Sequence, residues 1–326
     1  MKTSIPICPK CGYDQSGEIA TWESSCPVEG RCPECGLEFA WADLLDPSRV
    51  DVDWYIEHAK GPWGLVRRTL PTLWYLLIPN RFWKRVGIQT QVQLGHMIAW
   101  SVLTIIFLHI VSSVIFVVAD FMVAYKWGNG QSSSLLSFIT EFDVSIAQQI
   151  LGNKMWWMDS LTTGFGHPFF RNWWWPDTES TSKALRMLIL CFGFTAMWLI
   201  ILSVIPTTRR LAKLRAQHVL RAMILSFLMP VVFVEIVRLI DAGIFFMKGP
   251  FPGSDTIEFF VGLVLAHSII YGMVFWVQWH WISAIRSGWK IHPNGLLICI
   301  GLFGSTVCSY LFASLLSAMW MIMEYS

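Results

Sequence analysis

The chain has 326 residues, of which 54% are hydrophobic and 14% charged, and its formal net charge is +2. Soluble domains carry about 25% charged residues, so this composition excludes an ordinary soluble protein and indicates that much of the surface faces lipid. The small net charge provides no basic footprint, and we therefore expect no nucleic-acid partner.

The N-terminal segment contains two copies of a C-P-x-C-G motif, at residues 8–12 and 32–36. Paired C-x-x-C turns at this spacing are typical of a zinc ribbon, and four thiolates close the tetrahedral shell of a structural Zn²⁺. The duplicated motif favours zinc over a redox pair or disulfides. The predicted metal ligands are Cys8, Cys11, Cys32 and Cys35, with Cys26 as an alternative or extra ligand.

Residues 1–45 are predicted to form this ribbon, on the cytoplasmic side of a membrane. A segment so short builds little core, so the metal is expected to supply the folding energy. Reducing conditions in the cytoplasm keep the thiols available for zinc. We expect Trp22, Phe39 and Trp41 to cover the metal site.

Residues 46–91 are predicted to form a linker with an interfacial amphipathic segment. Within it, residues 64–87 mix basic and aromatic side chains, and Pro71 and Pro79 are expected to break the helix. The pattern predicts short helices lying on the cytoplasmic leaflet, either as a plain anchor or as a contact with anionic lipid. The candidate lipid-binding residues are Arg67, Arg68, Arg81, Lys84 and Arg85.

Residues 92–326 are predicted to form a membrane domain with five transmembrane helices, because a span needs about 20 mainly apolar residues. The fold class that we predict is therefore an all-α polytopic membrane bundle with a small N-terminal zinc ribbon. The predicted spans are residues 94–119, 185–205, 219–246, 257–281 and 295–323.

Basic residues gather before the first span, between the second and third, and between the fourth and fifth. These places share one side of a five-span layout, which predicts a cytoplasmic N-terminus and an outer C-terminus. The inner membrane of a bacterium is the expected location. An outer loop at 120–183 is rich in aromatic residues, which indicates an interfacial belt or a binding cap for lipid or sugar.

Ionisable residues inside membrane spans are costly and are therefore candidate sites. Glu235, Arg238 and Asp241 lie three apart on the third span, and Asp120 lies at the outer end of the first. Spacing of three allows contacts along one helix face. The cluster is either a self-neutralised structural group or part of a transport or lipid-handling pathway.

Two pairs of histidines, His96 with His109 and His267 with His280, are each thirteen residues apart on the first and fourth spans. Facing pairs of this kind would suit haem b in an electron-transfer subunit, since haem needs two axial ligands. At about 100° per residue, however, the two histidines of one helix lie about 140° apart around its axis. Polar groups packed between helices are the simpler interpretation.

The ribbon pattern at residues 8–17 and 31–36 resembles one that precedes membrane domains in many bacterial proteins. The stretch at 79–83 followed by five spans is similar to a Yip1-like membrane domain. That resemblance implies a five-helix bundle that acts in membrane organisation or trafficking-type interactions without catalysis.

The sequence contains no H-E-x-x-H, G-x-S-x-G, P-loop or G-x-G-x-x-G motif. Our first functional hypothesis is a non-enzymatic membrane scaffold or adaptor whose cytoplasmic ribbon docks a protein partner. The alternatives are a transporter or lipid-handling protein, using the charged cluster on the spans, and a haem-b subunit, using the four histidines.

Overall fold

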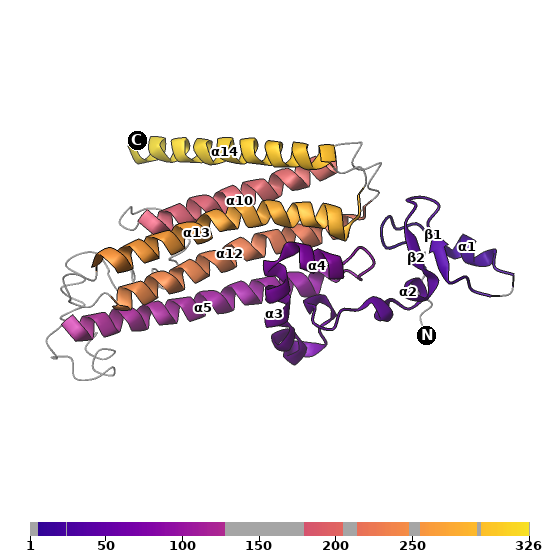
Figure 1. Cartoon of the computed structure of the whole chain (residues 1–326), viewed down its shortest axis with the longest axis horizontal. Coiled ribbons are helices and arrows are strands. Elements are labelled where there is room, and N and C mark those ends of the chain that lie inside the picture. The colour runs from indigo at the N-terminus through magenta and orange to yellow at the C-terminus, as the bar shows by residue number, and fades with distance from the viewer. Residues whose placement is uncertain are drawn as a thin grey trace. The chain divides into compact units, whose positions relative to one another are not determined.

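The computed structural model describes most of the chain, and its helical elements dominate (Figure 1). It divides into two compact units, formed by residues 1–102, 190–229 and 275–326 and by residues 103–189 and 230–274. The described residues are 6–23, 25–127, 179–204, 214–247, 255–291 and 295–325. Most of the predicted aromatic loop, residues 128–178, lies outside them.

Each of the five predicted apolar segments forms a long helix. Where a helix boundary is described, it lies within a few residues of the predicted one, except that the first helix continues beyond residue 119. Continuous apolar composition over more than 20 residues explains this agreement, because it is a local property of the sequence. The helices are α5 (Leu94–Trp127), α10 (Glu179–Val204), α12 (Ala216–Met247), α13 (Asp255–Ser283) and α14 (Gly295–Tyr325).

Among the described residues, two helical segments are long and apolar enough to cross a membrane, Leu94–Ser112 and Ala216–Val237. Leu188–Ser203 and Gly295–Leu311 are shorter apolar helices. The mostly helical fold is confirmed, and two candidate spans agree with a membrane association, whereas the count of five spans stays a prediction. Only 22% of the first segment is buried inside the protein, so most of its side chains are partly or largely exposed.

The N-terminal ribbon consists of α1 (Ser16–Ala20), the antiparallel strands β1 (Glu29–Arg31) and β2 (Glu38–Ala40), and α2 (Trp41–Leu45). Phe39 and Trp41 pack edge to face at 5.0 Å between ring centroids, and Trp22 contacts Trp41 at 4.8 Å. A Cβ on Gly30 would lie 2.6 Å from Nε1 of Trp41, so only glycine fits opposite this ring. The aromatic cover that we predicted is confirmed.

Two 3₁₀ turns, η1 (Pro47–Val50) and η2 (Ile56–His58), lead into α3 (Gly61–Leu77) and α4 (Pro79–Arg85). The prediction that Pro71 breaks the helix was wrong, because α3 continues through it, whereas Pro79 does separate α3 from α4. Thr72 and Leu76 are both fully buried after Pro71, so packing beyond the proline holds the helix together.

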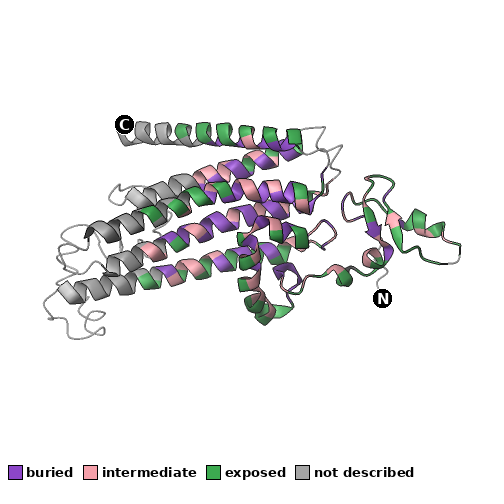
Figure 2. Cartoon of the chain, viewed as in Figure 1, coloured by how far each residue is buried: buried purple, intermediate pink, exposed green. Residues whose placement is uncertain are grey.

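One face of α3 and α4 is fixed to the rest of the first unit. The indole Nε1 of Trp276 donates to the carbonyls of Leu76 and Leu77 at 3.2 Å, at the end of α3. Trp83 of α4 packs against η3 (Ala284–Gly288), a π-helical turn after α13, where a Cβ on Gly288 would approach the Trp83 ring to 2.7 Å. Figure 2 shows that α3 nevertheless keeps an exposed side.

A glycine contact and a series of side-chain hydrogen bonds join α10, α13 and α14. A Cβ on Gly301 would lie 2.0 Å from the ring of Trp198, so the two helices approach closely only because residue 301 is glycine. The Trp198 indole donates to Oε1 of Gln278 at 2.9 Å, and Nε2 of Gln278 donates to Oγ of Ser305 at 2.9 Å.

Candidate metal centre and buried polar clusters

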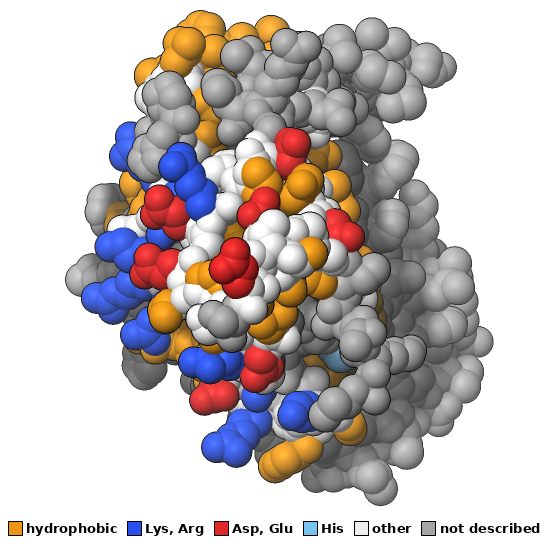
Figure 3. All heavy atoms as spheres, turned by 90° about the vertical axis from the view of Figure 1, so that its right-hand side faces the viewer, with side chains coloured by type: hydrophobic (Ala, Val, Ile, Leu, Met, Phe, Trp, Pro, Cys, Tyr) orange, Lys and Arg blue, Asp and Glu red, His pale blue; other side chains and the backbone are white. Residues whose placement is uncertain are grey.

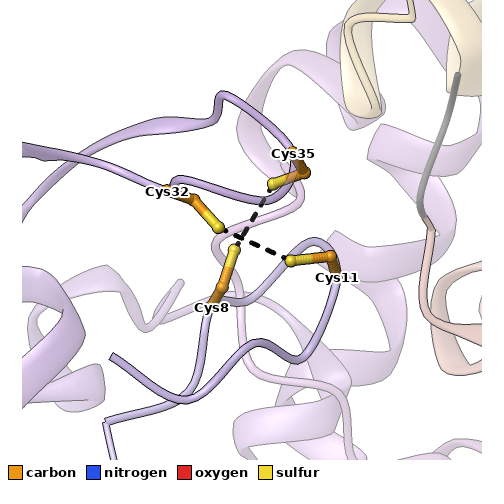
Figure 4. Close-up of side chains that lie close together, drawn as sticks. All are labelled: Cys8, Cys11, Cys32 and Cys35. Carbon is orange, nitrogen blue, oxygen red and sulfur yellow. Dashed lines mark hydrogen bonds between the residues drawn. The ribbon is translucent and has the colours of Figure 1, made fainter. Parts of the chain in front are cut away.

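The four cysteines of the two motifs bring their sulfurs together between the two turns of the ribbon (Figure 4). All four Sγ atoms lie within 4.8 Å of one another, with 3.7 Å between Cys8 and Cys35 and 3.6 Å between Cys11 and Cys32. Zinc–sulfur bonds of about 2.3 Å in a tetrahedron would separate the sulfurs by about 3.8 Å. The cluster is therefore consistent with a zinc ribbon and compatible with a structural metal such as Zn²⁺.

The two turns have the same backbone pattern, which explains why the duplicated motif forms one site. In each turn the glycine amide donates to the carbonyl of the first cysteine at 2.9 Å. Both glycines have left-handed backbones, with φ of +83° at Gly12 and +66° at Gly36. A side chain would strain this conformation, so the glycines set the tight turn that aims both sulfurs of a motif at one point.

The thiols are held in unequal environments when no metal neutralises them. Burial raises the pKa of Cys8 to about 11. Burial also opposes ionisation of Cys32, but hydrogen bonds from the backbone of Cys35 and Glu34 outweigh it and lower the pKa of this thiol. Backbone N–H groups aimed at sulfur stabilise thiolate, which is the form that binds metal.

Cys26 lies apart from the four-sulfur cluster. Its side chain is exposed, and its thiol donates to the carbonyl of Pro27 at 3.3 Å. The sulfur cluster comprises one C-x-x-C pair from each turn. A ligand role for Cys26 stays a prediction.

The first turn of the ribbon also contacts the start of α12. The amide of Arg215 donates to the carbonyl of Lys10 at 2.9 Å, and Nε2 of His218 donates to the carbonyl of Pro9 at 2.8 Å. Both acceptors lie between the two cysteines of the first motif. The conformation of the first C-P-x-C-G turn is therefore coupled by hydrogen bonds to Arg215 and to the first turn of α12.

Sequence reasoning did not single out the ion pair of Glu57 with Arg221, which is almost completely buried in the first unit. The guanidinium of Arg221 donates from Nε to Oε1 of Glu57 at 3.0 Å and from Nη2 to Oε2 at 2.6 Å. Nη2 also donates to the carbonyls of Thr90 and Gln91 at 3.1 and 2.9 Å. The side chains of Glu57 and Arg221 are 0% and 1% exposed. The arginine near the start of an apolar helix is the signal that could have indicated such a partner.

Glu235 also has a partner that was not predicted. Its Oε1 lies 3.0 Å from Nδ1 of His109, and the hydroxyl of Ser112 donates to its Oε2. His109 and Ser112 lie three apart on α5, a spacing that places them on one face. The cluster therefore combines residues of α5 and α12 inside the second unit. The side chains of Asp120, Arg238 and Asp241, the other predicted members, lie outside the described residues.

The other histidines of the haem hypothesis have separate surroundings. Nδ1 of His96 lies 3.4 Å from the carbonyl of Glu57, and Nε2 of His280 donates to the carbonyl of Ala222 at 3.2 Å. The His280 ring stacks on Trp276, with 4.9 Å between centroids. The side chain of His267 lies outside the described residues. The three described histidines thus each contact their own protein group.

The candidate lipid-binding cations are mostly exposed on α3 and α4. Arg67, Arg81, Lys84 and Arg85 are exposed, whereas Arg68 is half-buried and donates to the carbonyl of Tyr55 at 3.4 Å. The guanidinium of Arg85 lies over the Tyr75 ring, 4.6 Å from its centroid.

No protein-family model, curated protein or solved structure matches this chain. The Yip1-like resemblance and a bacterial origin therefore stay predictions that no family match supports.

Proposed function

We propose that the chain is a non-enzymatic integral membrane scaffold or adaptor whose zinc ribbon, on the cytoplasmic side, docks a protein partner. The observation that carries this proposal is the closed set of four cysteine sulfurs. Four thiolates complete the coordination of zinc and leave no position for a reactive water, which is the arrangement of structural rather than catalytic zinc.

The surface charge of the ribbon supports a protein partner with basic groups. Residues 1–45 contain seven acidic and three basic residues, and most of the acidic side chains are exposed. Figure 3 shows a face on which exposed Asp and Glu side chains lie among Lys and Arg side chains. Complementary charge steers association and disfavours partners of the same sign. Nucleic acid, whose phosphates are negative, is a poor match for this surface.

Deleting residues 1–45 is expected to abolish capture of the partner from solubilised membranes while the shortened chain stays in the alkali-resistant membrane fraction. Cys32→Ser should reproduce the loss, because it opens the metal site. Cys26→Ser is the matched control and should capture the partner normally, since Cys26 lies apart from the cluster. Undiminished capture by the deleted chain would contradict the proposal.

A second candidate function, transport or lipid handling, is favoured by the contact of Glu235 with His109 on two apolar helices. A buried carboxylate and an imidazole in contact are groups suited to carry a proton. Glu235 is 1% exposed, so its carboxylate contacts protein groups rather than water.

Glu235→Gln removes the charge but keeps a side chain that hydrogen bonds, so its unfolding temperature should stay near that of the parent. Proton flux into proteoliposomes, followed with a pH-sensitive dye, should fall to the level of empty vesicles. Glu235→Ala should in addition lower the free energy of unfolding by about 1–2 kcal/mol, because the polar contacts are lost. Equal proton flux in the parent and in Glu235→Gln would contradict the transport function. The contact of Glu235 with His109 would then have only a structural role.

A further inference from the structure

Helix α3 presents a continuous apolar stripe that no described part of the protein covers. The stripe consists of Trp63, Val66, Leu70, Trp74 and Leu77, which are 78%, 64%, 78%, 67% and 37% exposed. At about 100° per residue, these five positions fall within about 80° of the helix circumference. Such a row of large exposed side chains marks an interaction surface rather than scattered apolar residues.

The opposite face of α3 is fixed to the protein. Thr72 and Leu76 are fully buried there, and Oγ1 of Thr72 donates to the carbonyl of Trp54 at 3.0 Å. Together with the indole of Trp276, these contacts hold the helix in one rotational orientation. The stripe is therefore directed outwards by the fold.

Charge around the stripe identifies its occupant. Residues 58–119 contain six basic residues and no aspartate or glutamate. Arg67 lies at the edge of the stripe, and the exposed cations of α4 and of the adjoining turn η3 follow, namely Arg81, Lys84, Arg85 and Arg286. A basic surface next to an apolar stripe with two tryptophans is complementary to the headgroup region of an anionic bilayer.

The helix that follows along the chain, α5, also exposes apolar side chains, which an apolar environment such as a bilayer would cover. Helix α5 starts seventeen residues after α3 ends and exposes Ile98, Val102, Ile106 and Phe107. We propose that α3 lies in the headgroup interface of an anionic leaflet, with its stripe towards the acyl chains and the cations of α4 on the phosphates. This inference rests on the membrane location in the proposed function, and it adds a lipid-binding surface that docking through the ribbon does not need.

The first test measures burial of the stripe in a bilayer. The full chain, with the exposed Cys26, Cys299 and Cys308 replaced by Ala and zinc bound, is incorporated into nanodiscs that contain phosphatidylglycerol. Leu70→Cys should react with a membrane-impermeant maleimide about tenfold more slowly than Val28→Cys, since an interfacial helix buries its apolar face about 5–10 Å deep. Val28 is the matched control because it is 83% exposed and belongs to the ribbon.

The second test measures the preference for anionic lipid. Arg81→Gln, Lys84→Gln and Arg85→Gln should each reduce the retention of phosphatidylglycerol over phosphatidylcholine by about fivefold, and salt should reduce it further. Arg31→Gln, which removes an exposed cation from the ribbon, should leave retention unchanged.

The outcomes separate this inference from the proposed function. A chain that does not incorporate into nanodiscs contradicts the membrane location and therefore both proposals. A chain that incorporates but whose Leu70→Cys reacts as fast as Val28→Cys overturns only the interfacial helix, and its stripe would then be available to a protein partner.

Discussion

Arg221→Ala is expected to lower the free energy of unfolding by about 3–5 kcal/mol, measured by thermal unfolding in detergent. The substitution leaves the carboxylate of Glu57 fully buried with its bidentate partner gone. It also frees the carbonyls of Thr90 and Gln91, which accept from the same nitrogen. The effect is large because a buried charge without a partner costs far more than the pair contributes when it is intact.

A double substitution distinguishes this mechanism from a general loss of packing. Glu57→Leu combined with Arg221→Met removes both charges and fills similar volume, so it should recover most of the stability that Arg221→Ala loses. Arg85→Gln is the matched surface control, because this exposed arginine contacts only the Tyr75 ring and hydroxyl among the described residues. Its effect should stay within about 0.5 kcal/mol. An equally small effect for Arg221→Ala would contradict the buried pair.

Local sequence patterns predicted the helices and the four-cysteine cluster because both depend on neighbouring residues. An apolar run longer than 20 residues favours a helix as a local property, and two C-P-x-C-G turns with the same backbone pattern direct their sulfurs towards one point. The choice of Cys32 over Cys26 followed from the duplicated motif and agrees with the geometry. Pro71 shows the limit of such rules, because burial of Thr72 and Leu76 outweighs the local effect of the proline.

The polar contacts depend on packing between distant segments, and the sequence predicted them poorly. Glu57 and Arg221 are 164 residues apart, and no spacing rule joins them. His109 was paired in the prediction with other histidines, and Glu235 with Arg238, because only contacts within one helix are visible in a sequence. The structure places Nδ1 of His109 3.0 Å from Oε1 of Glu235, on two different helices. The predicted contact of Glu235 with Arg238 is not tested, because the side chain of Arg238 lies outside the described residues. A charged residue inside an apolar helix therefore predicts that a partner exists, but not which one.

Removing zinc is expected to unfold the ribbon while the helical part stays folded. Binding of structural zinc contributes about 10–16 kcal/mol at pH 7, which is more than the small core around Phe39 and Trp41 supplies. After treatment with a chelator, hydrogen exchange should become fast across residues 6–45. Protection should also fall at the amide of Arg215, because its acceptor is the carbonyl of Lys10 in the metal-binding turn. Retained protection in the ribbon would contradict a metal-dependent fold.

Zinc affinity should also fall as the pH is lowered, because the metal binds thiolate and protons compete for it. The pKa of Cys8 is about 11 without metal, so this thiol is protonated at neutral pH and must release a proton on binding. Release of this one proton should make the zinc affinity fall about tenfold for each pH unit below neutrality. Competition with a chromogenic chelator measures the affinity. Cys26→Ser should keep one zinc per chain and the same pH dependence, whereas Cys32→Ser should lose most of the affinity. A binding curve independent of pH would exclude thiolate ligation, and with it the structural role that the docking function requires.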